Sequence, residues 1–180
     1  MEVKRLFIAT FVEQRIFGRH FDNIKSLFGD SCSGKWTELN NLHFTYKFLG
    51  NVEIGKLDEV KDALKGITGN YDSVLKFNGL GCLLRKNEPD ILYARIYSPD
   101  KSTNKHFFDI EKRMIDLGFA KERKKFLPHV SLLRIKIHNE NFREIFETNK
   151  NLYIGKQVKY SINLVASTLT HDGPIYDIIE

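Results

Sequence analysis

Residues 41–50 read Asn-Leu-His-Phe-Thr-Tyr-Lys-Phe-Leu-Gly, and residues 126–134 read Phe-Leu-Pro-His-Val-Ser-Leu-Leu-Arg. Each segment places a histidine, one apolar residue and a hydroxyl residue inside an apolar run that is long enough for a β-strand. Side chains alternate between the two faces of a strand, so residues two apart point the same way, roughly 6.5 Å from one another along the chain. Each segment therefore directs an imidazole and a hydroxyl at one target: His43 with Thr45, and His129 with Ser131.

The pattern of a histidine followed two residues later by a hydroxyl is weak evidence when it occurs once. With six histidines in 180 residues, chance supplies about half an instance, if composition is treated as a flat prior. The surroundings make it more specific, because a strand with Leu, Phe and Val on one face turns its polar pair toward the other face. A structural histidine explains either segment alone, whereas the matched pair favours a shared binding face.

Strand-like runs and helical stretches alternate around these two segments. Apolar residues at three- and four-residue spacing predict helices at 12–28, 54–64, 99–118 and 141–149. Short apolar runs predict strands at 4–11, around Trp36, at 42–49 (closed by Gly50 and Asn51), 74–84, 91–97, 130–137, 158–169 and 175–179, with a turn at 85–90. This order indicates the α+β class. No glycine-rich phosphate loop follows any strand, which disfavours the nucleotide-cofactor folds.

Length and composition indicate one folded, soluble domain spanning residues 1–180. The chain is 42% hydrophobic and 28% charged, which is close to the globular average. Its apolar runs are far shorter than the roughly 18 to 20 residues of a membrane helix, and the start of the chain lacks the features of a signal peptide. Cys32 and Cys82 have no partner at ligand spacing, which predicts free thiols in a reducing cytoplasm. The net charge of +5 favours phosphate-bearing partners without requiring them.

The two histidine segments resemble the paired signatures of the two-histidine phosphoesterases. The closest similarity is to the RNA 2′,3′-cyclic phosphodiesterases, also called 2′,5′ RNA ligases, and it extends from residue 5 to residue 179. Three further features are similar to that family: the start Arg5-Leu6-Phe7-Ile8-Ala9, an aromatic residue (Trp36) before the first motif, and Ser167-Thr168-Leu169 followed by Gly173-Pro174-Ile175-Tyr176. The resemblance implies a bilobed α+β fold, with two small, mostly antiparallel sheets facing a central cleft and helices outside.

The resemblance also implies an activity, the opening of a terminal 2′,3′-cyclic phosphate on RNA or a nucleotide to leave a 2′-phosphomonoester. It suggests His43 as the acid that protonates the departing oxygen and His129 as the base that activates water, although a pseudo-symmetric site could run the opposite way. Two imidazoles suit this chemistry because an unperturbed pKa near about 6.5 makes both protonation states available. The scheme requires no metal and no cofactor, and the sequence has no carboxylate-rich cluster to hold a metal.

Thr45 and Ser131 are predicted to donate hydrogen bonds to the non-bridging phosphate oxygens. Arg134 could add a positive charge there. On a regular strand, however, it lies on the opposite face from His129, so it reaches the phosphate only through a bulge or from the end of the strand.

Other residues are weaker candidates for contacts with the substrate. The aromatic residues Trp36, Tyr46 and Phe126 could stack on a base, although aromatic residues on strands more often belong to the core. Lys124 lies in a basic run (residues 121–125) that either contacts the RNA backbone or forms a solvated loop. We expect a monomer with no membrane partner. Two rival functions stay open: cleavage or joining of 2′,5′-linked RNA, and non-catalytic binding of RNA ends.

Overall fold

The computed structural model describes residues 2–171 and 173–179, and within them the chain forms two five-stranded antiparallel sheets with helices on their outer faces. The strands are β1 (Val3–Phe11), β2 (Cys32–Trp36), β3 (His43–Glu53), β4 (Gly69–Tyr71), β5 (Leu75–Arg85), β6 (Glu88–Tyr97), β7 (His129–His138), β8 (Tyr153–Gln157), β9 (Tyr160–Leu169) and β10 (Pro174–Ile179). The α-helices are α1 (Gln14–Phe28), α2 (Leu57–Leu64), α3 (Ser102–Asp116) and α4 (Asn141–Asn149), with short 3-10 turns at Leu39–Asn41 and Ile54–Lys56.

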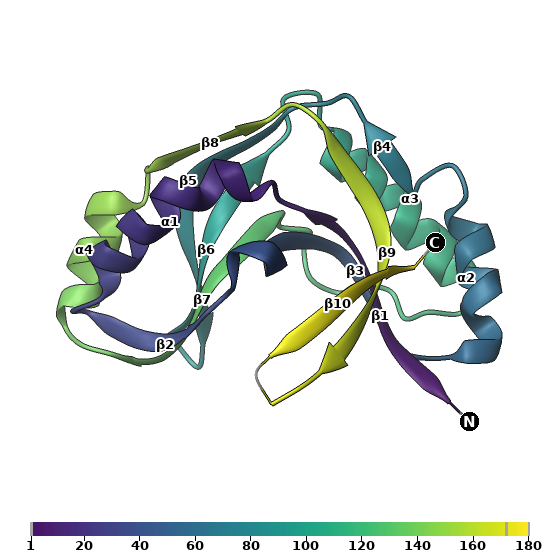
Figure 1. The fold of residues 1–180 in the computed structure, drawn as a ribbon, viewed down its shortest axis with the longest axis horizontal. Helices are drawn as coiled ribbons and strands as arrows, with labels where there is room; N and C mark the ends of the chain where they lie inside the picture. Colours follow the sequence, from purple (N-terminus) through teal and green to yellow (C-terminus); the bar gives the residue numbers. More distant parts are fainter. Residues whose placement is uncertain (1, 172, 180) are drawn as a thin grey trace.

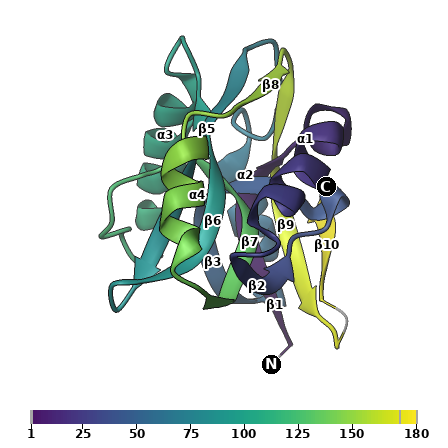
Figure 2. The same cartoon turned by 90° about the vertical axis from the view of Figure 1, so that its left-hand side faces the viewer.

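Each sheet is assembled from distant parts of the chain. The first sheet has the order β10-β9-β1-β3, with β4 paired to β9, and the second has the order β2-β7-β6-β5-β8. The two sheets form an arch, with α2 and α3 outside the first and α1 and α4 outside the second (Figure 1). In the view turned by 90°, α4 and α1 lie in front of the strands of the second sheet (Figure 2). The α+β fold with two antiparallel sheets and outer helices is confirmed.

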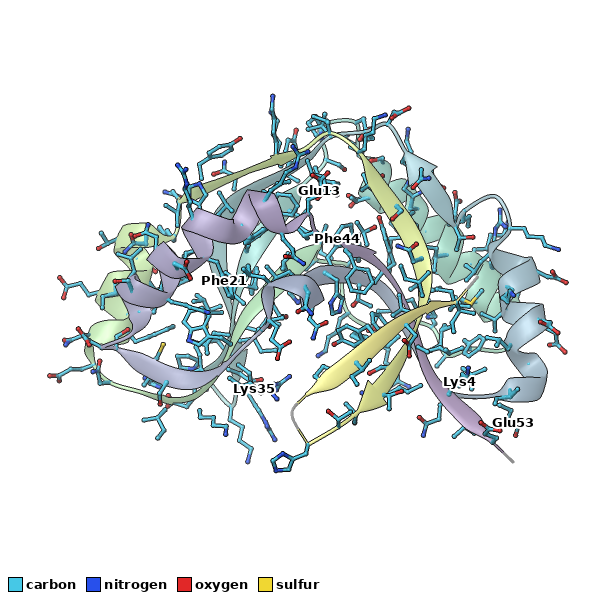
Figure 3. The ribbon with its side chains drawn as sticks, in the orientation of Figure 1. Lys4, Glu13, Phe21, Lys35, Phe44 and Glu53 are labelled. Atoms are coloured by element: carbon cyan, nitrogen blue, oxygen red, sulfur yellow. The ribbon has the colours of Figure 1, made fainter. Side chains whose placement is uncertain are left out.

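The apolar stripe predicted for the first helix explains why α1 packs where it does. Phe17 meets Phe77 of β5 edge to face at 5.2 Å, and Phe21 meets Trp36 of β2 at 5.7 Å. Burial of several large aromatic rings is the main source of stability in such a helix–sheet layer. Phe21 and Phe44 lie inside the molecule, whereas Lys4 and Glu53 lie at its surface (Figure 3). None of the helices in the described residues is long and apolar enough to cross a membrane.

The predicted end of the second long strand was wrong. Gly50 and Asn51 do not close it, because β3 continues to Glu53. The pairing of β1 with β3 steps from Leu6 opposite Gly50 to Phe7 opposite Phe48, which leaves Leu49 unpaired in a β-bulge. Gly50 has φ +73° there, and glycine adopts this left-handed conformation without the steric cost of a Cβ. The glycine thus marks a bulge within the strand and not its end.

The sequence analysis did not predict two short strands, and it predicted one turn that is longer than the observed turn. β4 and β8 have three and five residues, too few for an alternating pattern to stand out. The turn predicted at 85–90 consists of Lys86 and Asn87, both with positive φ, which suits a two-residue hairpin turn. Pro89 instead lies near the start of β6.

Candidate active site

A cavity of about 390 Å³ lies between the two sheets and draws its lining from both. β3 of the first sheet contributes His43, Thr45 and Phe48, and β7 of the second sheet contributes His129, Ser131 and Arg134. These strands belong to different sheets and start 86 residues apart (129 − 43). The structure therefore brings both predicted imidazoles, both hydroxyls and the arginine to one cavity.

Both histidines are held by the same backbone contact. His43 Nδ1 lies 2.7 Å from the carbonyl oxygen of Asn41, and His129 Nδ1 lies 2.7 Å from that of Leu127. A carbonyl oxygen can only accept a hydrogen bond, so Nδ1 carries the proton in both rings. When either ring is neutral, its Nε2 is the free basic nitrogen. The two imidazoles are thus prepared in the same tautomer, each able to take or give a proton at Nε2.

The two strands also share a bulge at the same offset from their histidine. In β3, Ile8 pairs with Lys47 and Ala9 with Thr45, so Tyr46 is the extra residue. In β7, Leu92 pairs with Leu133 and Tyr93 with Ser131, so Leu132 is the extra residue. In each strand the bulge therefore comes three residues after the histidine.

The bulge decides which side chains beyond the hydroxyl reach the cavity. An extra residue reverses the alternation of side chains, so the fifth residue after each histidine returns to the face of that histidine. Phe48 and Arg134 occupy this position in β3 and β7, and both line the cavity. The sequence analysis required a bulge, or a place at the end of the strand, for Arg134 to reach the face of His129, and the bulge at Leu132 provides this. Its guanidinium is largely exposed and lies 3.9 Å from the carboxylate of Asp90.

The surroundings of the two imidazoles differ. The ring of His43 lies against the rings of Phe7, Phe11 and Tyr176, with centroids 5.2, 5.6 and 5.1 Å away. Burial among these rings lowers the pKa of His43, because the charged imidazolium loses its hydration. The hydrogen bond to the Asn41 carbonyl opposes this shift, and the charge of His129 adds a smaller lowering. His129 has one aromatic neighbour among the described ring contacts, Tyr93 at 5.0 Å.

The structure corrects two of the four weaker predictions. Tyr46 and Phe126 do not line the cavity. Their rings stack on each other at 6.1 Å, and Phe126 stacks on Phe107 of α3 at 4.2 Å. Alternation along β3 explains Tyr46, because this residue lies on the face opposite His43 and Thr45, together with Phe44, and is buried there. In the described part of the chain, the ring contacts of both residues are with other aromatic rings away from the cavity.

Trp36 and Lys124 have different outcomes. Trp36 lines the cavity, and its indole also meets the ring of Phe21 edge to face. Lys124 is exposed on the connection before β7 and does not line the cavity.

Other cavity residues were not identified from the sequence as parts of the site. On the side of His43, the cavity is lined by the rings of Phe7 and Tyr176. Its lining also includes two further cations, Arg5 and Lys35. The alternation of β1 already separates Leu6 and Ile8 from Arg5 and Phe7. What it could not show is that the face with Arg5 and Phe7 lines the cavity beside residues of β3 and β10. Within residues 2–171 and 173–179, no group of three or more histidine, cysteine or acidic side chains could hold a metal ion.

Comparisons with known proteins point to one family of phosphoesterases. Residues 18–93 match the family model described as LigT-like phosphoesterase. The chain is 30% identical over 148 residues to an RNA 2′,3′-cyclic phosphodiesterase of Methanocaldococcus jannaschii, covering 81% of this chain and 82% of that protein. It is 28% identical over 183 residues to an RNA 2′,3′-cyclic phosphodiesterase of Aquifex aeolicus, covering 100% and 97%.

Solved structures share the fold at lower identity. The structure of TT0787 of Thermus thermophilus superposes with a TM-score of 0.77 at 19% identity, covering 98% of this chain and 95% of that one. The apo structure of E. coli LigT superposes with a TM-score of 0.76 at 18% identity, covering 100% and 96%.

Proposed function

This chain belongs to the LigT-like phosphoesterases, together with the RNA 2′,3′-cyclic phosphodiesterases that it resembles. From this membership and the geometry of the cavity, we propose the following reaction for the protein. It hydrolyses a terminal 2′,3′-cyclic phosphate on RNA or a nucleotide to a 2′-phosphomonoester, with no metal ion. The observation that carries the proposal is the pair of imidazoles in one cavity, each fixed through Nδ1 and each accompanied by a hydroxyl.

The proposed step moves two protons across one phosphorus atom. The oxygen of a water molecule forms a bond to phosphorus while the bond from phosphorus to O3′ breaks. His129 accepts the proton of the water at Nε2, and His43 delivers the proton from its own Nε2 to O3′. Each Nδ1–H stays on its backbone carbonyl, so the rings keep their orientation during the transfer.

The remaining polar groups of the cavity act on the phosphate oxygens. The hydroxyls of Thr45 and Ser131 are proposed to donate to the two non-bridging oxygens, where the negative charge resides. The bulge in β7 brings Arg134 to the same cavity, where its charge stabilises the dianionic character that develops during attack. Among the weaker candidates, Trp36 keeps a proposed contact with the nucleotide because it lines the cavity.

The relatives support the substrate class. The matched proteins from Methanocaldococcus jannaschii and Aquifex aeolicus are named RNA 2′,3′-cyclic phosphodiesterases, and one structure of E. coli LigT holds 3′-AMP. Because the cavity draws on both sheets, we propose that residues 1–180 work as one domain and that a single copy is sufficient.

The decisive experiment measures turnover of an oligonucleotide with a 2′,3′-cyclic phosphate end in excess chelator. We expect conversion to a 2′-phosphomonoester, and we expect His43→Ala and His129→Ala each to lower kcat by about 10² to 10⁴-fold. His138→Ala is the matched control: this histidine lies on β7 as well, but it pairs with Glu88 and does not line the cavity, so turnover should stay unchanged.

Three results would contradict the proposal or redirect it. Loss of turnover on chelation would contradict the metal-free reaction. Faster cleavage or joining of 2′,5′-linked oligonucleotides than of cyclic ends would assign the cavity to that bond. Tight binding of the cyclic end with no product would indicate a binding module.

A further inference from the structure

A buried ion pair joins the strand of the first histidine to the helix that precedes the second. Lys47 Nζ of β3 lies 2.6 Å from Glu111 Oε2 of α3, and the two side chains are only 5% and 10% exposed. Lys47 lies four residues after His43 and directly follows the bulge residue Tyr46. It does not line the cavity, so it has no part in the proposed chemistry itself.

Both charged groups also hold the backbone of the α3–β7 connection (residues 117–128), which contains no helix or strand and leads directly to His129. Lys47 Nζ donates a second hydrogen bond to the carbonyl oxygen of Ala120 at 2.8 Å. The other carboxylate oxygen of Glu111 accepts a hydrogen bond from the backbone N–H of Glu122 at 2.6 Å. The pair therefore fixes the first part of the connection to β3 and α3 at once.

The end of the same connection is held by the neighbouring residue on β3. Tyr46 stacks on Phe126, which is three residues before His129, and Phe126 stacks on Phe107 of α3. The backbone N–H of Ile96 donates to the carbonyl oxygen of Pro128 at 3.2 Å. The bulge in β3 makes these contacts possible, since it turns two consecutive side chains, Tyr46 and Lys47, into the interior.

A buried ion pair is a poor source of stability, because its desolvation cancels most of the attraction and apolar residues of similar volume often do as well. An apolar pair at these positions would fill the space but would leave Ala120 and Glu122 without their partners. What the charges supply is a fixed position for the backbone. Catalysis by two opposed groups is sensitive to displacements of about 1 Å.

We propose that Lys47 and Glu111 are positioning residues that hold the α3–β7 connection, and through it His129, at a fixed place relative to the strand that carries His43. This inference rests on the proposed two-histidine reaction. β3 thereby determines the position of His129 as well as that of its own histidine, His43.

The test is the double variant Lys47→Met/Glu111→Leu, which removes both charges and keeps the volume. We expect a folded protein whose kcat for the cyclic phosphate falls at least about tenfold, while KM changes by less than about threefold. Backbone amides of residues 119–127 should exchange their hydrogens faster than in the wild type. Lys47→Met alone leaves the carboxylate of Glu111 buried without its cation, so it serves only to show the loss of stability.

The matched control is Lys150→Met/Glu147→Gln, which removes an exposed ion pair of the same 2.6 Å length on the far side of the second sheet. It should change neither kcat nor the exchange of residues 119–127. A folded Lys47→Met/Glu111→Leu protein with wild-type kcat would overturn the inference, as would unchanged exchange in this segment. Absence of turnover in the wild type would instead refute the proposed function. Hydrogen exchange of residues 119–127 would then still test whether Lys47 and Glu111 hold the connection. If the double variant does not fold, Lys47→Met/Glu111→Gln, which also removes both charges but keeps an acceptor for the backbone N–H of Glu122, takes its place with the same two measurements.

Discussion

His43 and His129 share a motif, a tautomer and a backbone contact, yet three aromatic rings surround the first and one ring contacts the second. The aromatic wall excludes water from His43 and lowers its pKa below the ordinary value of 6.5. A bound phosphate diester carries a negative charge that acts in the opposite direction and favours the imidazolium. The wall thus makes the protonation of His43 depend on whether the cavity is occupied.

The wall can be opened without touching the cavity, because Phe11 contacts His43 but is not among the cavity residues. The pH profile of kcat/KM reports the free protein, so the limb due to His43 should lie below pH 6.5. As the acid, His43 must be protonated, and activity is then lost as the pH rises through that limb. We expect Phe11→Ala to admit water and to move this limb upward.

Phe11→Leu is the control, because it keeps the apolar contact and should leave the limb near its original place. A limb that does not move in Phe11→Ala would argue against burial as the cause of the shift. If the limb that moves is instead the one through which activity rises with pH, the roles of His43 and His129 are exchanged.

At the scale of the elements, the bulges in β3 and β7 shape the cavity. Each adds one residue after the hydroxyl, and each thereby brings the fifth residue after the histidine back to the cavity side. The two strands place different chemistry there, an aromatic ring (Phe48) in one and a guanidinium (Arg134) in the other. The site is therefore symmetric in its imidazoles and hydroxyls and asymmetric around them.

The pairing of β2 with β7 beside Arg134 leaves no room for a side chain. A Cβ at Gly34 would lie 2.0 Å from the carbonyl oxygen of Arg134, which is backbone and cannot swing away. We expect Gly34→Ala to force β2 from β7, to lower the free energy of unfolding by about 1 to 3 kcal/mol and to reduce turnover, as measured by urea denaturation and the cyclic phosphate assay.

Gly18→Ala provides the comparison, since this glycine lies in the middle of α1 and a Cβ there meets no atom within 4 Å. It should raise the free energy of unfolding by about 0.5 to 1 kcal/mol, because alanine favours the helix more than glycine does. If both substitutions act alike, the close approach at Gly34 is not what limits that position.

At the scale of the whole molecule, the two sheets form two halves of one site. The chain crosses between them repeatedly, and its first and last strands, β1 and β10, both belong to the first sheet (Figure 1). Neither sheet alone carries two histidines of the cavity, since His43 belongs to the first and His129 to the second. The cavity therefore exists only when both halves have folded against each other.

Two groups that act on one phosphorus in one step should not contribute independently. We expect kcat of the double variant His43→Ala/His129→Ala to lie within about tenfold of the worse single variant, far from the product of the two losses. The measurement is residual conversion of the cyclic end over long incubations. Losses that multiply would indicate that the histidines serve separate steps or separate sites.

Much of the fold and the central part of the site could be predicted locally. The strand and helix periods in the sequence are set by neighbouring residues, so the long elements were predicted to within a few residues, and α4 was predicted at the observed bounds 141–149. The pairing of an imidazole with a hydroxyl two residues on is likewise a local property of a strand. β4 and β8 were not predicted, because strands this short form through hydrogen bonding to β9 and β5 and show no clear pattern of their own.

Local patterning alone shows which imidazole and hydroxyl share a face, because alternation along a strand requires no distant partner. The packed fold, by contrast, brings Arg134 into the cavity and turns Lys47 away from it, because a bulge is a mismatch between two paired strands and belongs to neither alone. The packed fold also surrounds the ring of His43 with three aromatic rings and places Lys47 where it binds the backbone of the α3–β7 connection. These depend on strand register and helix packing, which join residues far apart in the chain.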